Sequence, residues 1–139
     1  DGPPPEDLRG PGTVHRLGRV GDDRLLALAF SAADLVVLPS LFDNLPNILL
    51  EALACGTPCV GFAIGGIPEA IRPGVTGALA SALTGAALAA QVEAMLGAVR
   101  GQRAEWSGRC RAFALAHYDP TRQARRHLDL LEELSHVAP

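Results

Sequence analysis

Two carboxylates flank the start of a predicted helix in the middle of the chain. Asp43 lies in a loop after an apolar segment, and Glu51 lies eight positions later, inside a helix expected to open at Pro46. The backbone amides of residues 44–48 approach that helix start, where N–H groups without helical partners and the helix dipole attract anions such as phosphate. Carboxylates accept hydrogen bonds from vicinal hydroxyls. This combination suits a sugar nucleotide, which carries a diphosphate, a ribose and a hexose.

Each of these residues also has an ordinary structural explanation. Asp43 alone is typical of an Asx turn or a helix cap, and Glu51 alone is typical of a solvated helix face. Glu69 fits the cap of a short helix. Four glycines fit turns and a helix end, namely Gly56, Gly65, Gly66 and Gly77. The case for a site therefore depends on the elements around the two acids.

Those elements alternate between strand and helix. Buried-strand patterns are predicted at residues 14–20, 34–38, 58–62 and 78–80. Helices are predicted at residues 24–32, 46–55, 68–71, 86–99, 102–116 and 121–135, with Asp22 or Asp23 capping the first. The last helices are expected to bury one face each, through Ala114, Leu128, Leu131 and Leu134. The pattern indicates an α/β fold with a Rossmann-like parallel sheet wrapped by helices and a helical C-terminus. Ligands bind such sheets outside the carboxyl ends of the strands, where Asp43 is expected.

Composition limits the class of protein. The 139 residues are 48% hydrophobic and 19% charged, which excludes a disordered chain. A net charge of −3 argues against a general binder of nucleic acid or of anionic membranes. No apolar run is long enough to span a membrane, so a cytoplasmic location is expected. Residues 1–12 are rich in Pro, Gly and acids and are expected to form a disordered arm or linker, and residues 13–139 to form one domain.

Three cysteines, Cys55, Cys59 and Cys110, make an odd count in a chain large enough to fold without disulfides. Cys55 and Cys59 are four positions apart, but no further Cys or His pair lies nearby to complete a zinc site. We interpret all three as reduced, partly buried thiols, and we expect no metal site in the chain.

Three motifs together resemble a known family. The stretch from Ala33-Asp-Leu-Val-Val-Leu-Pro-Ser40 through Glu51-Ala-Leu-Ala-Cys-Gly-Thr-Pro-Cys-Val60 to Gly65-Gly-Ile-Pro-Glu69 closely resembles the C-terminal, donor-binding domain of family 4 (group 1) glycosyltransferases. The resemblance extends over residues 14–137. It implies a GT-B fold, in which two Rossmann-like domains face each other across a cleft. It also implies metal-independent sugar transfer from a UDP- or GDP-linked donor, with retention of configuration.

The resemblance also implies roles for individual residues. The family carries two glutamates separated by seven residues; Glu51 matches the second, and Asp43 stands in place of the first, one methylene shorter. Glu51 is then expected to bind the ribose hydroxyls and Asp43 the donor hexose, and these two are our candidate catalytic residues. Asn44 and Leu45 match positions whose amides reach the sugar and the diphosphate. Pro46 and Asn47 complete the predicted donor-binding set.

The resemblance covers only part of the family's donor domain. Two further strand–helix units, with a glycine turn and a basic pair that neutralises the diphosphate, would precede residue 14, and the acceptor domain has no counterpart here. We therefore expect the chain to be a portion of a longer enzyme and to be inactive alone. The sheet edge along residues 34–38 would be left open to the residues at 14–20 or to a second copy of the chain.

Three functional hypotheses remain at this level. The first is the donor-binding part of a glycosyltransferase for cell-surface polysaccharide or glycoconjugate synthesis, peripheral at the inner membrane face when intact. The second is another GT-B enzyme, such as a sugar-nucleotide epimerase. The third is a non-catalytic remnant that serves as an interaction module.

Overall fold

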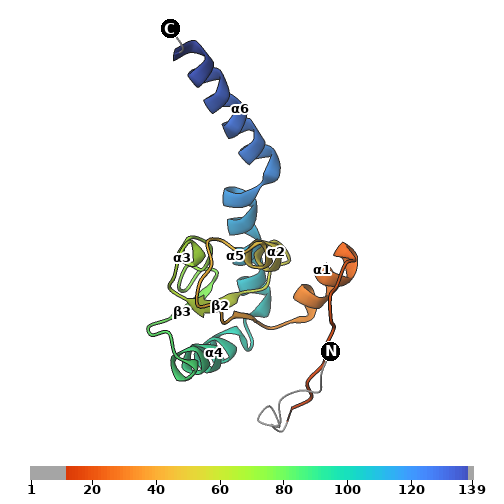
Figure 1. The fold of residues 1–139 in the computed structure, drawn as a ribbon. Coiled ribbons are helices and arrows are strands. Elements are labelled where there is room, and N and C mark those ends of the chain that lie inside the picture. The colour runs from red at the N-terminus through yellow and green to blue at the C-terminus, as the bar shows by residue number, and fades with distance from the viewer. Residues whose placement is uncertain (1–11, 138–139) are drawn as a thin grey trace.

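Helices and strands alternate along most of the chain, in the order that the sequence predicts (Figure 1). The computed structural model describes residues 12–137. Its helices are α1 (Asp23–Ala32), α2 (Asn47–Ala54), α3 (Ile67–Ala70), α4 (Gly85–Val99), α5 (Arg103–Tyr118) and α6 (Pro120–Val137). Its strands are β1 (Val36–Leu38), β2 (Cys59–Phe62) and β3 (Gly77–Ala80). Most of the predicted bounds are confirmed to within two residues.

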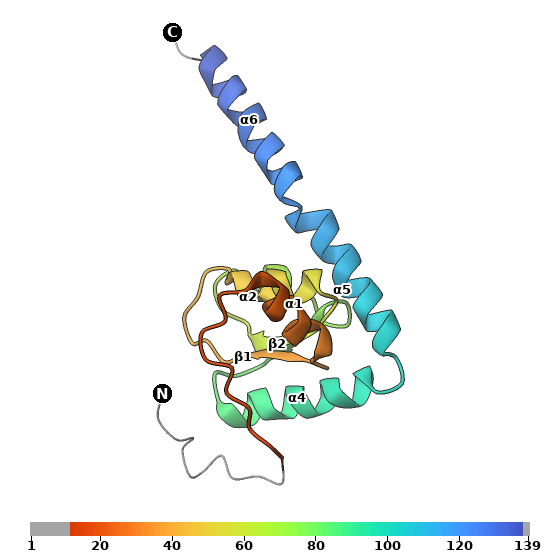
Figure 2. The same ribbon diagram turned by 90° about the vertical axis from the view of Figure 1, so that its right-hand side faces the viewer.

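Within the described residues, the three strands form one parallel sheet in the order β1-β2-β3. In the central strand, Cys59 lies beside Val36 of β1 and Gly77 of β3. All four residues of β2 are buried, because helices cover both faces of the sheet. Figure 2 shows α4 on one face and α1 and α2 on the other. This confirms the α/β class and the parallel sheet.

The core divides into two clusters, one on each face of the sheet. Side chains alternate along a strand, so Cys59 packs with α2, α3 and α5, whereas Val60 and Phe62 pack with α4. Trp106 of α5 belongs to the second cluster and is 5% exposed. Its indole N–H donates to the carbonyl oxygen of Ala98 at 3.2 Å, and the Arg109 guanidinium lies 4.1 Å from its ring centroid.

Polar contacts hold α1 beside this core. The Asp22 carboxylate accepts from the amides of Arg24 (2.8 Å) and Leu25 (3.2 Å), which confirms the predicted N-cap. The hydroxyl of buried Thr57, just after α2, donates to the Phe30 carbonyl oxygen at 2.6 Å. Arg103 of α5 binds the Asp34 carboxylate at 2.5 Å, where α1 leads into β1. The segment before the candidate site is therefore tied to the loop between α2 and β2 and to α5.

The prediction of a strand at residues 14–20 is wrong. These residues, which the structure describes, form neither a helix nor a strand, and Val14 and Leu17 are 52% and 63% exposed. A strand of this length needs a neighbour to complete its hydrogen-bond ladder and to cover its apolar side chains. Residues 14–20 pair with no strand, so they do not cover the edge of β1. The predicted arm at residues 1–12 lies, apart from Gly12, outside the described residues.

The expectation that the last helix buries a leucine face is also wrong. Ala114 of α5 is buried at 4% exposure, as predicted, but Leu128, Leu131 and Leu134 of α6 are exposed by 60%, 62% and 58%. After Asp119 the chain turns into α6, which extends away from the sheet and its covering helices (Figure 2). The helical periodicity is present, but nothing in the described part of the chain packs on it. None of the described helices combines the length and the apolar character needed to cross a membrane.

Candidate functional site

The loop after β1 carries Asp43 to the carboxyl end of the sheet, where the sequence places it. Its side chain is half-buried, and its neighbours Phe42 and Asn44 are exposed. Because β1 and β2 are adjacent and parallel, the loops that follow them leave the sheet on the same side. The loop after β2 contains Gly65 and Gly66, and it packs directly on the Asp43–Asn44 backbone.

This packing requires glycine at both positions. The Gly66 amide donates a hydrogen bond to the Asn44 carbonyl oxygen. A Cβ at Gly66 would overlap that same oxygen, and a Cβ at Gly65 would overlap the carbonyl oxygen of Asp43. Gly65 also has a φ of +50°, in the left-handed region that favours glycine. The two glycines therefore allow the loop after β2 to lie directly against the Asp43–Asn44 backbone. From the sequence alone, these glycines were expected only to form turns.

The start of α2 follows this loop. The helix begins at Asn47, with Pro46 as its N-cap, so it starts one position later than the predicted opening at Pro46. Pro46 has no side-chain acceptor, unlike Asp22 and Thr84, which cap α1 and α4 through their side chains. The first-turn amides of α2 are consequently left without a side-chain cap. Asn47 and Ile48 are both exposed at this end.

Glu51 lies one turn further along α2, on an exposed part of the helix. Its side chain lines a pocket of about 340 Å³ between α1 and α2. The other residues that line this pocket are Asp23, Leu26, Ala27, Phe30, Ala54 and Cys55. Asp43 is not among them. The structure thus brings Asp43, Asn44 and the glycine pair together at the strand ends, and it places Glu51 beside α1.

Both candidate carboxylates are unengaged. Within residues 12–137, neither the Asp43 nor the Glu51 side chain forms a hydrogen bond or an ion pair. Asp34 and Asp22, by contrast, are held by Arg103 and by the amides that start α1. The two carboxylates therefore remain available as hydrogen-bond acceptors for a ligand. The first amides of α2, which have no side-chain cap, remain available as donors. A hollow of about 510 Å³, larger than the α1–α2 pocket, lies elsewhere, at the junction of α5 and α6.

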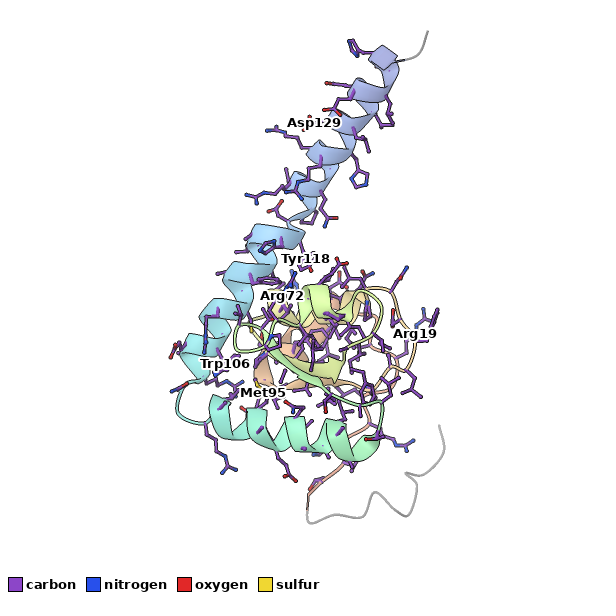
Figure 3. All side chains as sticks on the ribbon, turned by 90° about the vertical axis from the view of Figure 1, so that its left-hand side faces the viewer. Arg19, Arg72, Met95, Trp106, Tyr118 and Asp129 are labelled. Carbon is purple, nitrogen blue, oxygen red and sulfur yellow. The ribbon has the colours of Figure 1, made fainter. Side chains whose placement is uncertain are left out.

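Glu69 lies in the first turn of α3, with its side chain exposed. Its charge acts on Tyr118 at the end of α5: burial raises the pKa of the Tyr118 phenol, the negative charge of Glu69 adds to the rise, and Arg72 opposes it. Figure 3 shows Tyr118 and Arg72 near each other where α5 passes over α3. Glu69 therefore contributes to the electrostatics of this corner.

The cysteines are structural. All three, which lie in the described part of the chain, are free thiols, and both Cys59 and Cys110 are completely buried. Burial raises the pKa of Cys59 far above its ordinary value, with a further contribution from Cys110. Burial likewise raises the pKa of Cys110 to about 12, although the charge of Arg109 opposes the rise. Across residues 12–137, no three His, Cys, Asp or Glu side chains are grouped so that they could hold a metal ion.

Comparison with known proteins extends these observations. Curated relatives include the D-inositol 3-phosphate glycosyltransferase of Mycobacterium leprae (strain Br4923), 54% identical over 54 residues, which is 39% of this chain and 13% of that protein. The enzyme of the same name from Mycobacterium tuberculosis (strain ATCC 25177 / H37Ra) is 52% identical over 56 residues, 40% of this chain and 12% of that protein. The matched segments thus span about an eighth of these relatives.

A solved structure shares the fold. Sucrose-phosphate synthase from Thermosynechococcus elongatus superposes on 82% of this chain with a TM-score of 0.74 and 28% sequence identity, covering 28% of that protein. The parallel strands and flanking helices thus match part of a GT-B glycosyltransferase. The family profile described as "Glycosyl transferases group 1" matches residues 1–98, which is well over half of the chain. The chain belongs to the group 1 glycosyltransferase family.

Proposed function

We propose that this chain is the donor-binding part of a glycosyltransferase that moves a sugar from a UDP- or GDP-linked donor to an acceptor, with retention and without a metal ion. The observation that carries the proposal is the placement of Asp43 and the uncapped start of α2 at the carboxyl end of a parallel sheet. In such sheets this end binds ligands. Membership of the group 1 family supports the same assignment.

The proposed roles follow from the chemistry of each group. The first amides of α2 point along the helix axis toward any bound anion and suit the donor diphosphate. Asp43, held at the strand ends by the Gly65–Gly66 contact, is assigned to the hydroxyls of the donor hexose. Glu51, in the pocket beside α1, is assigned to the vicinal hydroxyls of the ribose. The α1–α2 pocket would then receive the nucleoside end of the donor.

The biological setting is part of the same proposal. We assign the transfer to cell-surface polysaccharide or glycoconjugate synthesis, in the cytoplasm or at the inner face of the membrane. The curated relatives carry names that denote glycosyl transfer to an inositol phosphate. The acceptor site and the basic groups that neutralise the diphosphate are assigned to parts of the enzyme outside this chain.

The test is a titration of the 139-residue chain, labelled with ¹⁵N, with UDP, GDP and ADP and with their sugar conjugates. We expect saturable amide shifts at residues 43–49 and in α1 for at least one nucleotide. Binding should be weak, because the basic pair that neutralises the diphosphate is assigned to a part of the enzyme outside this chain. A chain whose amides at residues 43–49 do not respond to any of these compounds at millimolar concentration contradicts the proposal, and the chain would then be a non-catalytic module.

A further inference from the structure

One face of α1 forms a wall of the pocket that this helix shares with α2. That face follows the helical spacing of three and four residues, and its members are Asp23, Leu26, Ala27 and Phe30. Glu51 lines the same pocket from α2. Figure 2 shows the two helices on the same face of the sheet. The volume of about 340 Å³ lies at the lower end of the range for small-molecule sites.

This pocket combines apolar walls with hydrogen-bond acceptors. Among the described residues that line it, the charged ones are Asp23 and Glu51, which are both acids, and the others are apolar apart from the Cys55 thiol. An ionised carboxylate accepts hydrogen bonds and donates none. The pocket therefore favours a ligand that presents N–H and O–H donors around an apolar surface.

The Asp23 carboxylate is available to such a ligand. The N-cap of α1 is Asp22, which accepts from the amides of Arg24 and Leu25, so the helix does not use Asp23 for capping. Within residues 12–137, the Asp23 side chain is exposed and forms no hydrogen bond or ion pair. The helix dipole favours an acid in the first turn on any side of the helix, so it does not account for the position of Asp23 in the pocket wall.

We propose that Asp23 selects a guanine base, so that the donor is a GDP-linked sugar. This inference rests on the proposed function, which assigns the ribose to Glu51 and the nucleoside end of the donor to this pocket. Guanine carries two neighbouring donors, N1–H and the 2-amino group, which match the two oxygens of one carboxylate as an arginine fork does. The rings of the base would then lie against Leu26 and Phe30, on the same face of α1 as Asp23.

The other bases of common sugar nucleotides match a carboxylate less well. Uracil has a single donor, N3–H, between two carbonyl oxygens, so one of these oxygens would face the second oxygen of Asp23. Adenine places the acceptor N1 beside its 6-amino group, and it would likewise set an acceptor against an acceptor. A site that attracts one ligand and repels its competitors is specific for the first. Asp23 therefore acts against uracil and adenine as well as in favour of guanine.

The test is an amide-shift titration of the ¹⁵N-labelled chain with GDP, inosine diphosphate, UDP and ADP at one salt concentration. GDP should bind about tenfold or more tightly than UDP and ADP, because only guanine presents two donors to one carboxylate. Inosine diphosphate lacks the 2-amino group and should bind several-fold more weakly than GDP. The shifts that GDP causes and UDP does not should fall at residues 23–30.

Three variants separate recognition of the base from binding in general. Asp23→Asn replaces one acceptor by a donor, a pattern that also fits uracil, so the preference for GDP over UDP should fall by about tenfold. Glu51→Gln should weaken GDP and UDP by the same factor, because both carry the same ribose. Asp129→Asn removes the same charge as Asp23→Asn from an exposed position on α6 and should leave every affinity unchanged. Circular dichroism should show the same helix content in all three.

The outcomes distinguish this inference from the proposed function on which it rests. Equal affinities for GDP and UDP in the wild-type chain, with amide shifts present at residues 43–49, overturn the choice of base and leave the proposed function standing. A preference for GDP that survives in Asp23→Asn overturns the role of Asp23. The absence of a response to every nucleotide overturns both.

Discussion

The two candidate carboxylates occupy different surroundings although both follow the first strand of the sheet closely in sequence. Asp43 is half-buried in a loop whose backbone is fixed by two glycines, so its side chain starts from a defined position. Glu51 is exposed on α2 and borders the pocket beside α1. The shorter acid is therefore the better positioned one, and the longer acid has the reach to follow a ligand in an open pocket.

Replacing Glu51 with glutamine should weaken nucleotide binding roughly tenfold, because a charge-assisted hydrogen bond to the ribose becomes a neutral one. The dissociation constant from the amide-shift titration measures this effect. Glu93→Gln on α4 is a matched control, since Glu93 is an exposed helical glutamate that lies on the other face of the sheet. Equal affinities for the two variants would remove Glu51 from the proposed site.

The three thiols should differ sharply in reactivity. Cys55 is half-buried, whereas Cys59 and Cys110 are completely buried and their pKa values are raised by burial. Since the thiolate is the reactive species, iodoacetamide at pH 8 should modify Cys55 in the native chain and all three cysteines in urea. Mass spectrometry of the native and the unfolded chain measures the number of adducts. Rapid native modification of Cys59 or Cys110 would contradict the packing of β2 against α5.

At the scale of elements, the sequence predicts best where a local signal decides the outcome. Asp22 caps α1 because its carboxylate meets two free amides, whatever the rest of the fold does. The apolar strand before Pro39 and the buried strand before the glycine pair are likewise found where they are predicted. The prediction of a strand at residues 14–20 is wrong because a strand needs a neighbouring strand to pair with, and the pattern of apolar residues does not show whether one is present.

The contact between the loops after β1 and β2 can be tested by a substitution that adds one methyl group. Gly66→Ala should lower the thermal unfolding midpoint and shift the amide signals of residues 43–45, because the new Cβ overlaps the Asn44 carbonyl oxygen. Gly97→Ala, inside α4, is the matched control: its Cβ meets open space, and alanine favours the helix by about 1 kcal/mol, so this change should stabilise the chain. An equally stable Gly66→Ala chain would refute the close approach of the two loops.

At the scale of the whole molecule, part of the candidate site was predictable and part was not. The position of Asp43 follows from strand order alone, because carboxyl ends of neighbouring parallel strands meet. The dependence of Asp43 on Gly65 and Gly66 was missed, since it arises between segments more than twenty residues apart. Its signal was nonetheless present: both motifs directly follow adjacent predicted strands. The exposure of the α6 leucines was not predictable, because the spacing of apolar residues along a helix does not show whether another segment packs on them.

Removing α6 should leave the rest of the molecule intact. A chain that ends at Asp119 loses no buried side chain, since all described side chains of α6 are exposed. We expect a thermal unfolding midpoint close to that of the whole chain at low concentration, measured by circular dichroism. A large drop in the midpoint would show that α6 supports the fold.

The single tryptophan has a practical consequence for studying this protein. Trp106 is enclosed by α4 and α5, with Ala98 as its hydrogen-bond partner and Arg109 over its ring. Its fluorescence emission therefore reports on the packing between those two helices, and it should not change when a ligand binds at the loop that carries Asp43. Phe42, which is 97% exposed directly before Asp43, is the natural position for a second fluorophore. A Phe42→Trp chain would emit from two places, one reading ligand arrival and the other reading the integrity of the core.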